Sequence, residues 1–470
     1  MFVNPLIFRA YDIRGIAHKP ASDKPVDLTP ETAEIIGKAT GTYYLTHYGK
    51  NLAVGGDNRL STPELKEAFI KGLLSTGCNI TDIGLVTSPM LYYAVCKLDL
   101  DGGIAITASH NPKEYNGIKL VRKNAHAVCG DELQLLIQII EENSFKRGTG
   151  KLESRDDIFD LYIEDMKKMV TIDRPLKVIV DAGNGITGKY APALLRAFGC
   201  EVTELFCDLD GNFPNHPANP EDVENLEVLI EKMKTGKYDI GLGFDGDGDR
   251  VGIVDEKGHH YAADLHLLLL AQDLLSRHPG SKIVFDVKAS QVVPNLIREY
   301  NGEPIMTKTG HSFIEQKMHE TGALLAGEVS GHLFFGEDYY GFDDAFVAAL
   351  RTLSILSKGP TDKTLSDYFK KIPPTFTTPE IKVPCPDNRK FQVVDALRDE
   401  FIKHYDCITI DGVRIIFDEN TWGIIRCSNT TPNITMRFEA LTEKRLKEVM
   451  KIVADAFSKY PEADQTWFKK

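Results

Sequence analysis

The sequence lacks the cysteine pattern of a zinc ribbon or a disulfide framework, since its eight cysteines include no C-x-x-C pair. It also lacks an apolar run long enough to cross a bilayer. The N-terminal segment carries Arg9 and Asp12 in place of the apolar stretch of a signal peptide, and low-complexity tracts are missing. These absences favour a cytoplasmic protein with free thiols and no membrane partner.

Positive charge is not in excess either. The 55 lysines and arginines stand against 68 aspartates and glutamates, which gives a formal net charge of −13. Because phosphate backbones attract basic surfaces, this balance argues against a nucleic-acid partner. A small anionic substrate remains compatible with it, since an arginine-lined pocket can be locally positive inside an acidic protein. The length of 470 residues predicts several domains.

Most of the chain alternates between two kinds of segment. Strand-like runs cover 51–57, 79–86, 176–185, 201–206 and 282–290, and helix-like runs cover 63–76, 89–98, 188–199 and 292–302. Repeated strand–helix–strand order predicts α/β layers with largely parallel sheets. The C-terminal part differs, with three short strands followed by a helix over 442–459. The sequence therefore predicts three mixed α/β domains and a smaller C-terminal α+β domain.

Composition indicates where the domains meet. A polar, glycine-bearing segment spans 141–154, a second break follows "VGIVDEKGH" near residue 255, and a proline- and threonine-rich segment spans 370–380. The predicted domains are accordingly 1–150, 151–255, 256–370 and 371–470.

The first segment with chemical interest is "GGIAITASHNPKEYNGIKL", residues 102–120. Its apolar start predicts a buried strand that ends in a loop, where Ser109 stands beside His110. Lys119 follows ten positions later, beyond a turn signal at Asn116-Gly117. From these residues alone, Ser109 is an ordinary loop hydroxyl, a nucleophile or a phosphate carrier.

The second segment is "GFDGDGDRVGIVD", in which Asp245, Asp247 and Asp249 alternate with glycines. Carboxylates this close repel one another and indicate a bound divalent cation. An EF-hand loop is excluded because Arg250 occupies the position that requires glycine. The hard oxygen donors suit Mg²⁺. A solvated acidic turn is the alternative, and Arg250 either meets an anion or neutralises the aspartates.

Two further segments offer hydrogen-bonding groups. In "GEVSGH", the alternating Glu328, Ser330 and His332 would point the same way along an extended backbone and suit sugar hydroxyls. In "RCSNTTPN", the Arg426 fork and the short polar side chains that follow it suit a dianionic phosphate. A satisfied loop carboxylate and a Ser/Thr-rich surface turn are the alternatives.

Together, "TASHNPxxYNGxK", "DGDGDR", "GEVSGH" and "SNTTPNITMRFEA" resemble in kind and order the motifs of the α-D-phosphohexomutase family, with matches from residue 8 to residue 440. The chain is similar to its bacterial phosphomannomutase/phosphoglucomutase group. The resemblance implies four domains, three of them with similar core topology, around a central active-site cleft. It also implies reversible interconversion of hexose 6-phosphate and hexose 1-phosphate, of mannose or glucose, through a phosphoserine enzyme. Hexose 1,6-bisphosphate would be both intermediate and activator.

The resemblance also implies residue roles. Ser109 would carry the phosphoryl group and bind Mg²⁺ with Asp245, Asp247 and Asp249. Lys119 and His311 are the implied acid/base groups, and Arg250 is a further implied catalytic residue. The implied substrate-binding residues are Tyr11, Arg14, Lys288, Glu328, Ser330, His332, Arg426, Ser428, Asn429 and Thr430. A base at Lys119 requires its pKa to fall from about 10.4, which neighbouring cations would achieve. The partner is a small phosphosugar, and we expect a monomer or homodimer.

Three alternatives remain open. Phosphoglucosamine mutases typically carry "GTDGIRG", "GEQSGH" and "SGTEP", where this chain has "RAYDIRG", "GEVSGH" and "SNTTP". A metal-dependent phosphatase would pass the phosphate to water, and a sugar-phosphate binder would catalyse nothing. Trace hexose 1,6-bisphosphate would prime a mutase, whereas steady release of phosphate would favour the phosphatase.

Overall fold

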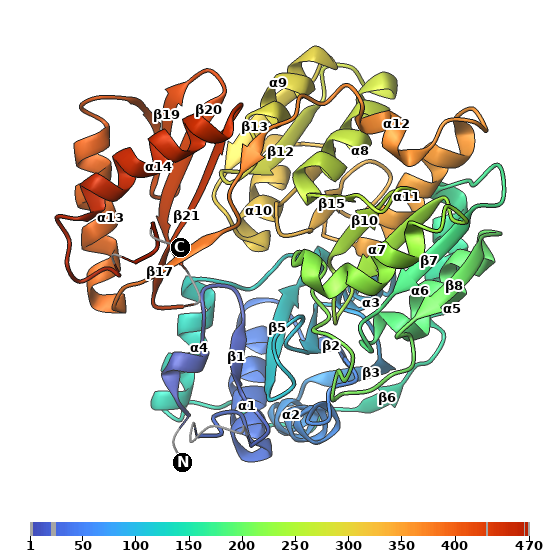
Figure 1. The fold of residues 1–470 in the computed structure, drawn as a ribbon. Helices are drawn as coiled ribbons and strands as arrows, with labels where there is room; N and C mark the ends of the chain where they lie inside the picture. The colour runs from blue at the N-terminus through green and yellow to red at the C-terminus, as the bar shows by residue number, and fades with distance from the viewer. Residues whose placement is uncertain (1–2, 20–24, 429–430, 465, 469–470) are drawn as a thin grey trace. The chain divides into compact units, whose positions relative to one another are not determined.

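The computed structural model describes residues 3–19, 25–428, 431–464 and 466–468. The chain forms two compact units. The first comprises Met1–Leu270 and Ser330–Tyr368, and the second comprises Ala271–Val329 and Phe369–Lys470. Figure 1 shows the elements of both units. Among the described residues, no helix has both the length and the apolar character needed to cross a membrane.

The first sheet belongs to the first unit and has the strand order β1-β5-β4-β2-β3-β6 (Figure 1). Its strands are β1 (Ile13–Ile16), β2 (Asn51–Gly56), β3 (Asn79–Leu85), β4 (Gly102–Ile106), β5 (Tyr115–Arg122) and β6 (Leu152–Ser154). Its helices are η1 (Pro5–Ile7), α1 (Pro30–His47), α2 (Thr62–Thr76), α3 (Ser88–Lys97), η2 (Lys123–Ala125) and α4 (Asp131–Glu141). Strands β4, β2, β3 and β6 are parallel, whereas β5 and β1 are antiparallel to their neighbours.

Local chemistry sets the limits of these helices. Thr29 forms a capping box at the start of α1, and Thr87 accepts a hydrogen bond from Met90 N–H at the start of α3. Gly77 ends α2 with a φ of 104°, a conformation that costs glycine little. Gly77 and Thr87 thus delimit the segment that contains β3.

The turn predicted at Asn116-Gly117 is wrong, because both residues lie inside β5. Asn116 is fully buried, and its Nδ2 donates to the Ser61 and Thr62 hydroxyls at 2.9 and 3.0 Å. These partners satisfy the amide inside the sheet, so Asn-Gly does not mark a turn here. The chain turns earlier, between β4 and β5.

The second sheet has the order β11-β10-β9-β7-β8, with β9, β7 and β8 parallel and β10 and β11 antiparallel to their neighbours. Its strands are β7 (Lys177–Asp181), β8 (Glu201–Leu205), β9 (Ile240–Phe244), β10 (Val251–Val254) and β11 (His260–Tyr261). Its helices are α5 (Ile158–Met169), α6 (Thr187–Ala197), η3 (Val223–Leu226) and α7 (Glu227–Met233). The first two sheets end at Ser154 and Tyr261, past the positions 150 and 255 chosen from composition.

The chain then crosses between the units. Helix α8 (Ala263–Arg277) spans the change at Leu270, and the segment after Val329 returns to the first unit. That segment contains β15 (Leu333–Phe335) and α11 (Ala345–Lys358), which packs on β10, and it runs into α12 (Leu365–Phe369). Residues far along the chain thereby come to lie beside the turn between β9 and β10.

The second unit contains three parallel strands in the order β13-β12-β14 and a C-terminal sheet in the order β16-β21-β20-β19-β18. The parallel strands are β12 (Lys282–Asp286), β13 (Glu303–Thr307) and β14 (Leu325–Gly327), with helices α9 (Val292–Glu299) and α10 (His311–Thr321). The C-terminal strands are β16 (Phe376–Thr377), β17 (Ile381–Pro384), which also pairs with β21, β18 (Asp406–Ile408), β19 (Val413–Asp418), β20 (Thr421–Cys427) and β21 (Asn433–Ala440). Helices α13 (Asp387–Phe401) and α14 (Glu443–Phe457) accompany them. This antiparallel sheet with its helices is the α+β fold expected for the C-terminal part.

Candidate active site

Ser109 lies at the carboxyl end of β4, in the loop that leads to β5. Its φ is 50°, a left-handed conformation that is uncommon for serine, and its side chain is buried. Its hydroxyl donates a hydrogen bond to Asp245 Oδ2 at 2.7 Å, and His110 Nδ1 lies 3.2 Å from the same hydroxyl oxygen. The surroundings therefore differ from those of an ordinary surface hydroxyl.

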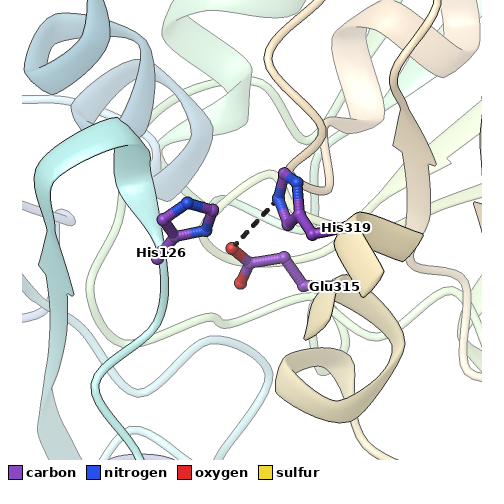
Figure 2. Close-up of side chains that lie close together, drawn as sticks. All are labelled: His126, Glu315 and His319. Atoms are coloured by element: carbon purple, nitrogen blue, oxygen red, sulfur yellow. Dashed lines mark ion pairs between the residues drawn. The ribbon is translucent and has the colours of Figure 1, made fainter. Parts of the chain in front are cut away.

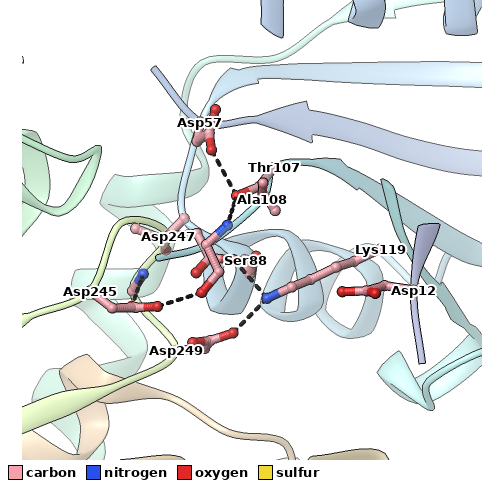
Figure 3. A network of polar contacts seen from close by, with 12 residues as sticks. Asp12, Asp57, Ser88, Thr107, Ala108, Lys119, Asp245, Asp247 and Asp249 are labelled. Atoms are coloured by element: carbon pink, nitrogen blue, oxygen red, sulfur yellow. Dashed lines mark hydrogen bonds and ion pairs between the residues drawn. The ribbon is translucent and has the colours of Figure 1, made fainter. Parts of the chain in front are cut away.

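Asp245, Asp247 and Asp249 lie on the turn between β9 and β10 (Figure 3). All three are buried, and one carboxylate oxygen from each lies within 4.8 Å of the others. Gly246 allows this turn to approach the serine loop, because a Cβ there would lie 2.4 Å from the Ser109 carbonyl oxygen. The carboxylates that the sequence predicts to converge do converge, beside Ser109.

This cluster fits a divalent cation. Oδ1 of Asp247 and Oδ1 of Asp249 are buried and accept no hydrogen bond from any described residue. Burial and the two neighbouring carboxylates raise the pKa of Asp245 well above its usual value. Several hard oxygens around one point of excess negative charge are the donor set that Mg²⁺ prefers. Carboxylate oxygens of the three aspartates and the hydroxyl oxygen of Ser109 are therefore the atoms that would hold such an ion.

Lys119 extends from β5 into the same cluster (Figure 3). Its Nζ donates to Asp247 Oδ2 at 2.7 Å and to Asp249 Oδ2 at 2.5 Å. Burial by itself would lower the pKa of Lys119, but the two carboxylates raise it well above its usual value. The expectation that nearby cations depress this pKa is wrong for this structure. Lys119 is instead an ammonium that offsets buried negative charge.

Arg14 and Tyr11 are predicted residues of the N-terminal segment, and Arg14 contacts the serine loop. Arg14 donates from Nε to Asp12 Oδ2 at 2.6 Å and from Nη1 to Asn111 Oδ1 at 2.9 Å. Tyr11 is partly exposed and precedes β1. Arg14 thus contacts the serine loop at Asn111, two residues after Ser109, and adds positive charge near this loop.

Arg250, Ser330 and His332 meet in the first unit although they are distant in sequence. Nε of Arg250 donates to His332 Nε2 at 3.2 Å, and Ser330 Oγ lies 2.9 Å from His332 Nδ1. His332 Nε2 also lies 3.4 Å from Asp249 Oδ1. Part of the predicted sugar loop therefore borders the aspartate cluster.

Glu328 and Lys288 lie in the second unit, at the carboxyl ends of parallel strands. Lys288 follows β12, and its Nζ lies 3.3 Å from Glu380 Oε2. Glu328 follows β14, and the nearby Asp286 accepts a hydrogen bond from Val329 N–H at 3.2 Å. Burial, with a contribution from the Glu328 carboxylate, raises the pKa of Asp286 to about 6. The two predicted residues thus share one edge of the parallel strands.

His311 is the first residue of α10, directly after Gly310. One and two turns further along the helix, Glu315 and His319 face each other, with 3.7 Å between Glu315 Oε1 and His319 Nε2 (Figure 2). The helix start leaves the His311 side chain partly exposed. Neither Glu315 nor His319 belongs to a motif identified in the sequence.

The predicted phosphate loop follows β20. Arg426 donates from Nε to Asp411 Oδ2 at 2.8 Å, and Ser428 Oγ lies 2.8 Å from Thr431 Oγ1. Lys390 Nζ donates to the carbonyls of Ser428 and Thr431 at 2.7 and 3.0 Å. Asn429 and Thr430 lie outside the described residues. Lys390 therefore adds a cation that the motif did not reveal.

Three residues that contact the serine loop or the aspartate cluster were not predicted from the sequence: Asp57, Arg59 and Ser88. Asp57 and Arg59 follow β2; Asp57 accepts a hydrogen bond from the Thr107 hydroxyl, and Arg59 donates to the Ser109 carbonyl. Ser88, at the start of α3, donates from Oγ to Asp247 Oδ2 at 2.6 Å (Figure 3). Polar residues directly after parallel strands, as in "GGDNR" and "LVTS", are the signal that could have found them, since such ends share one edge of a sheet.

Family models match nearly the whole chain. They are described as phosphoglucomutase/phosphomannomutase alpha/beta/alpha domain I over residues 5–147, domain II over 160–258, domain III over 262–376 and the C-terminal domain over 380–456. The chain belongs to the phosphoglucomutase/phosphomannomutase family. The resemblance stated from four short motifs and the predicted fold class are thereby confirmed.

Curated family members and solved structures agree. The chain is 46% identical over 444 residues to the phosphomannomutase/phosphoglucomutase of Pseudomonas putida, covering 94% of this chain and 93% of that protein. It is 42% identical to the phosphoglucomutase of Neisseria gonorrhoeae, covering 94% and 95%. A crystal structure of a phosphoglucomutase/phosphomannomutase family protein from Burkholderia thailandensis matches with a TM-score of 0.91 and 39% identity, covering 98% and 99%. The open form of the Paramecium phosphoglucomutase parafusin shares the fold, with a TM-score of 0.71 and 16% identity over 96% of this chain and 97% of that one.

Proposed function

We propose that this chain is a phosphohexomutase that interconverts hexose 6-phosphate and hexose 1-phosphate, with mannose or glucose as the sugar. The observation that carries the proposal is the buried Ser109 hydroxyl, 2.7 Å from Asp245 in a cluster of three aspartates. Family membership supports the same reaction. A protein that only binds sugar phosphates would not need so many buried charges, because burying each of them costs desolvation free energy.

The two sugar oxygens are too far apart for direct transfer, so a relay is needed. The phosphoryl group leaves Ser109 Oγ as the P–O bond to the serine breaks and a bond to the free sugar hydroxyl forms. The sugar hydroxyl gives up its proton, and Ser109 Oγ is left to take up the other phosphate of the resulting hexose 1,6-bisphosphate. A serine suits this role because its phosphate ester is stable in water.

The aspartate cluster would hold Mg²⁺, which would offset the charge of the transferring phosphoryl group when bound. Lys119 places an ammonium between Asp247 and Asp249 and so contributes positive charge beside the reacting oxygen. We retain Lys119 and His311 as the candidate acid/base groups. Their proposed task is to hold or move the proton that the two hydroxyls exchange.

Arg250 is proposed as a further catalytic residue, and the other predicted residues are proposed to bind the substrate. Arg250 and Arg14 supply positive charge beside the serine loop. The sugar hydroxyls are assigned to Glu328, Ser330 and His332, and the phosphate that is not transferred to Arg426, Ser428, Asn429 and Thr430, with Tyr11 and Lys288 completing the set. Because either end of the sugar must occupy the phosphate site in turn, hydroxyl and arginine donors suit it better than a shape-specific pocket.

Replacement of the relay group tests the proposal. Ser109→Ala should fold normally and lose mutase activity by about 10³-fold or more, because the phosphate has no carrier. Intact mass should show about 80 Da added to the wild type after incubation with glucose 1,6-bisphosphate, mapped to Ser109 and missing from the variant. Ser75→Ala, which removes a hydroxyl bonded to the Gly72 carbonyl, is the matched control and should keep full activity. Wild-type turnover by Ser109→Ala would refute the relay.

A panel of substrates separates this proposal from its alternatives. Mannose 1-phosphate, glucose 1-phosphate and glucosamine 1-phosphate are assayed side by side with trace bisphosphate. A preference for glucosamine 1-phosphate would indicate a phosphoglucosamine mutase. Stoichiometric release of inorganic phosphate without isomerisation would indicate a phosphatase.

A further inference from the structure

All five N–H groups of the Arg59 side chain donate hydrogen bonds, either to Asp57 or to the serine loop. Nε donates to Asp57 Oδ2 at 3.1 Å. The four remaining N–H groups serve loop carbonyls: Nη1 those of Pro112 and Tyr115 at 2.8 and 3.0 Å, and Nη2 those of Ser109 and Asn111 at 2.7 and 2.6 Å. An arginine has five N–H donors, so none is left over.

Burial makes these bonds consequential. Arg59 is 1% exposed, and its Cζ lies 5.1 Å from the ring centre of Phe213, which covers it. The bond to the Ser109 carbonyl is itself buried, so that carbonyl would stay unsatisfied if Arg59 released it. The guanidinium therefore fixes the path of residues 109–115 more tightly than a surface arginine could.

Asp57 also holds Thr107, which precedes Ser109 in the chain. It accepts hydrogen bonds from the hydroxyls of Thr107 and Thr62 at 2.7 and 2.6 Å, besides that from Arg59 (Figure 3 shows Asp57 and Thr107). The oriented Thr107 Oγ1 accepts in turn the N–H of Ser109 at 2.9 Å. Both backbone polar groups of Ser109 are thus held, the N–H through Thr107 and the carbonyl by Arg59.

The consequence for Ser109 is a fixed direction. Its φ of 50° is an unfavourable conformation for a residue with a Cβ, and the surrounding bonds maintain it. With the carbonyl turned to Arg59, the hydroxyl points to Asp245 Oδ2. We propose that Arg59, Asp57 and Thr107 form a positioning network that aims the phosphoryl group on Ser109 for transfer. Arg59 and Thr107 bond the backbone of Ser109 rather than its hydroxyl, and the inference rests on the proposed relay function.

Single-turnover transfer tests this inference. Wild-type and variant enzymes are phosphorylated with glucose 1,6-bisphosphate, the phosphate on Ser109 is quantified by intact mass, and the rate constant of its transfer to glucose 1-phosphate is measured. A merely structural role lowers the fraction of loaded enzyme or the melting temperature but leaves that rate constant unchanged. A positioning role lowers the rate constant itself.

Arg59→Lys keeps the charge but cannot reach four carbonyls, and we expect its transfer rate constant to fall about 10²-fold. KM for the sugar phosphate should stay within about threefold, since Arg59 is not assigned to the sugar. The matched control is Arg351→Lys, another arginine that bonds a carboxylate and a carbonyl and stacks 5.1 Å from a phenylalanine ring. Its rate constant should remain within twofold of the wild type.

Thr107→Val keeps the inference falsifiable if Arg59→Lys does not fold. This isosteric change removes the hydroxyl between Asp57 and Ser109 N–H and should reduce the rate constant about tenfold, with Thr107→Ser restoring it. A wild-type rate constant in folded Arg59→Lys or in Thr107→Val would overturn the inference. If the wild type itself transfers no phosphate, the proposed function fails instead, and the two failures are distinguishable.

Discussion

At the scale of single residues, the site is shaped by how buried charges are paired. Three aspartates lie out of contact with water, and Lys119, His332 and Arg250 stand against them. Although burial opposes it, Lys119 and then His332 hold the pKa of Asp249 well below its usual value. The pKa of Asp245 is instead raised, because burial and its like-charged neighbours act on it together. Chemically identical carboxylates on one turn thus acquire different proton affinities from their contacts alone.

Ser88 illustrates a contact that leaves one oxygen of a proposed cation ligand, Asp247, available. The Ser88 hydroxyl donates a hydrogen bond to Asp247 Oδ2, to which Lys119 also donates. Asp247 Oδ1 accepts no hydrogen bond from the described part of the chain. Groups that hydrogen-bond to a metal ligand orient that ligand, and their loss commonly weakens the affinity for the metal. We expect Ser88→Ala to weaken Mn²⁺ binding, followed by electron paramagnetic resonance, by about tenfold. Unchanged Mn²⁺ affinity would contradict an orienting role for this hydroxyl.

His216 provides a pH dependence away from the cluster. Its Nε2 lies 3.0 Å from Asp181 Oδ1, and although burial acts against it, this carboxylate raises the pKa of His216 above its ordinary value. A raised folded-state pKa stabilises the fold below the unfolded value of about 6.5, and that stabilisation disappears as pH rises through the folded pKa. His216→Asn should therefore lower the melting temperature more at pH 6 than at pH 9. Equal losses at both pH values would show that the charge on His216 does not contribute.

At the scale of elements, the residues of the candidate site lie where strands end. The loops after β2 and β4 and the turn after β9 supply Arg59, Ser109 and Asp245, and glycines without side chains let these segments touch. Gly246 is the tightest of these approaches, since its turn faces the backbone of the serine loop. The sheets provide rigidity, and the loops at their carboxyl edges provide the chemistry.

A methyl group at Gly246 tests this close approach. The added Cβ would lie 2.4 Å from the Ser109 carbonyl oxygen, which Arg59 holds in place, so the aspartate turn must move away. We expect Gly246→Ala to reduce kcat about 10²-fold, because small displacements of reacting groups are costly. Gly236→Ala is the control, since a Cβ there meets no atom within 4 Å and only its φ of 68° is penalised. Similar kcat values in the two variants would mean that the turn tolerates the shift.

At the scale of the whole molecule, the chain folds into two units that alternate along the sequence. The first contains the cores of the first two sheets, and the second contains the parallel strands β12–β14 and the C-terminal sheet. Both tryptophans of the chain, Trp422 and Trp467, are in the second unit and are buried there. Tryptophan fluorescence therefore reports on one unit, whereas far-UV circular dichroism reports on both.

This distribution predicts how the protein unfolds. In urea, the midpoint of the fluorescence transition should differ from that of the circular dichroism transition, because units with separate cores need not unfold together. Trp422→Phe and Trp467→Phe, measured singly, should give the same fluorescence midpoint as each other if both residues belong to one cooperative unit. Coincident fluorescence and dichroism midpoints in the wild type would contradict independent unfolding.

The strand and helix positions, the aspartate cluster and the family could be predicted from the sequence, because the underlying signals are local. Apolar periodicity specifies β2 and α2 to within one residue at each end, and the three aspartates of "DGDGDR" lie within a few positions of one another. The folded structure alone decided the partners of Lys119, the place of Asn116 inside β5 and the bonds of Arg59. Those are contacts between residues tens to more than a hundred positions apart, and the periodicity of a segment contains no information about what packs against it.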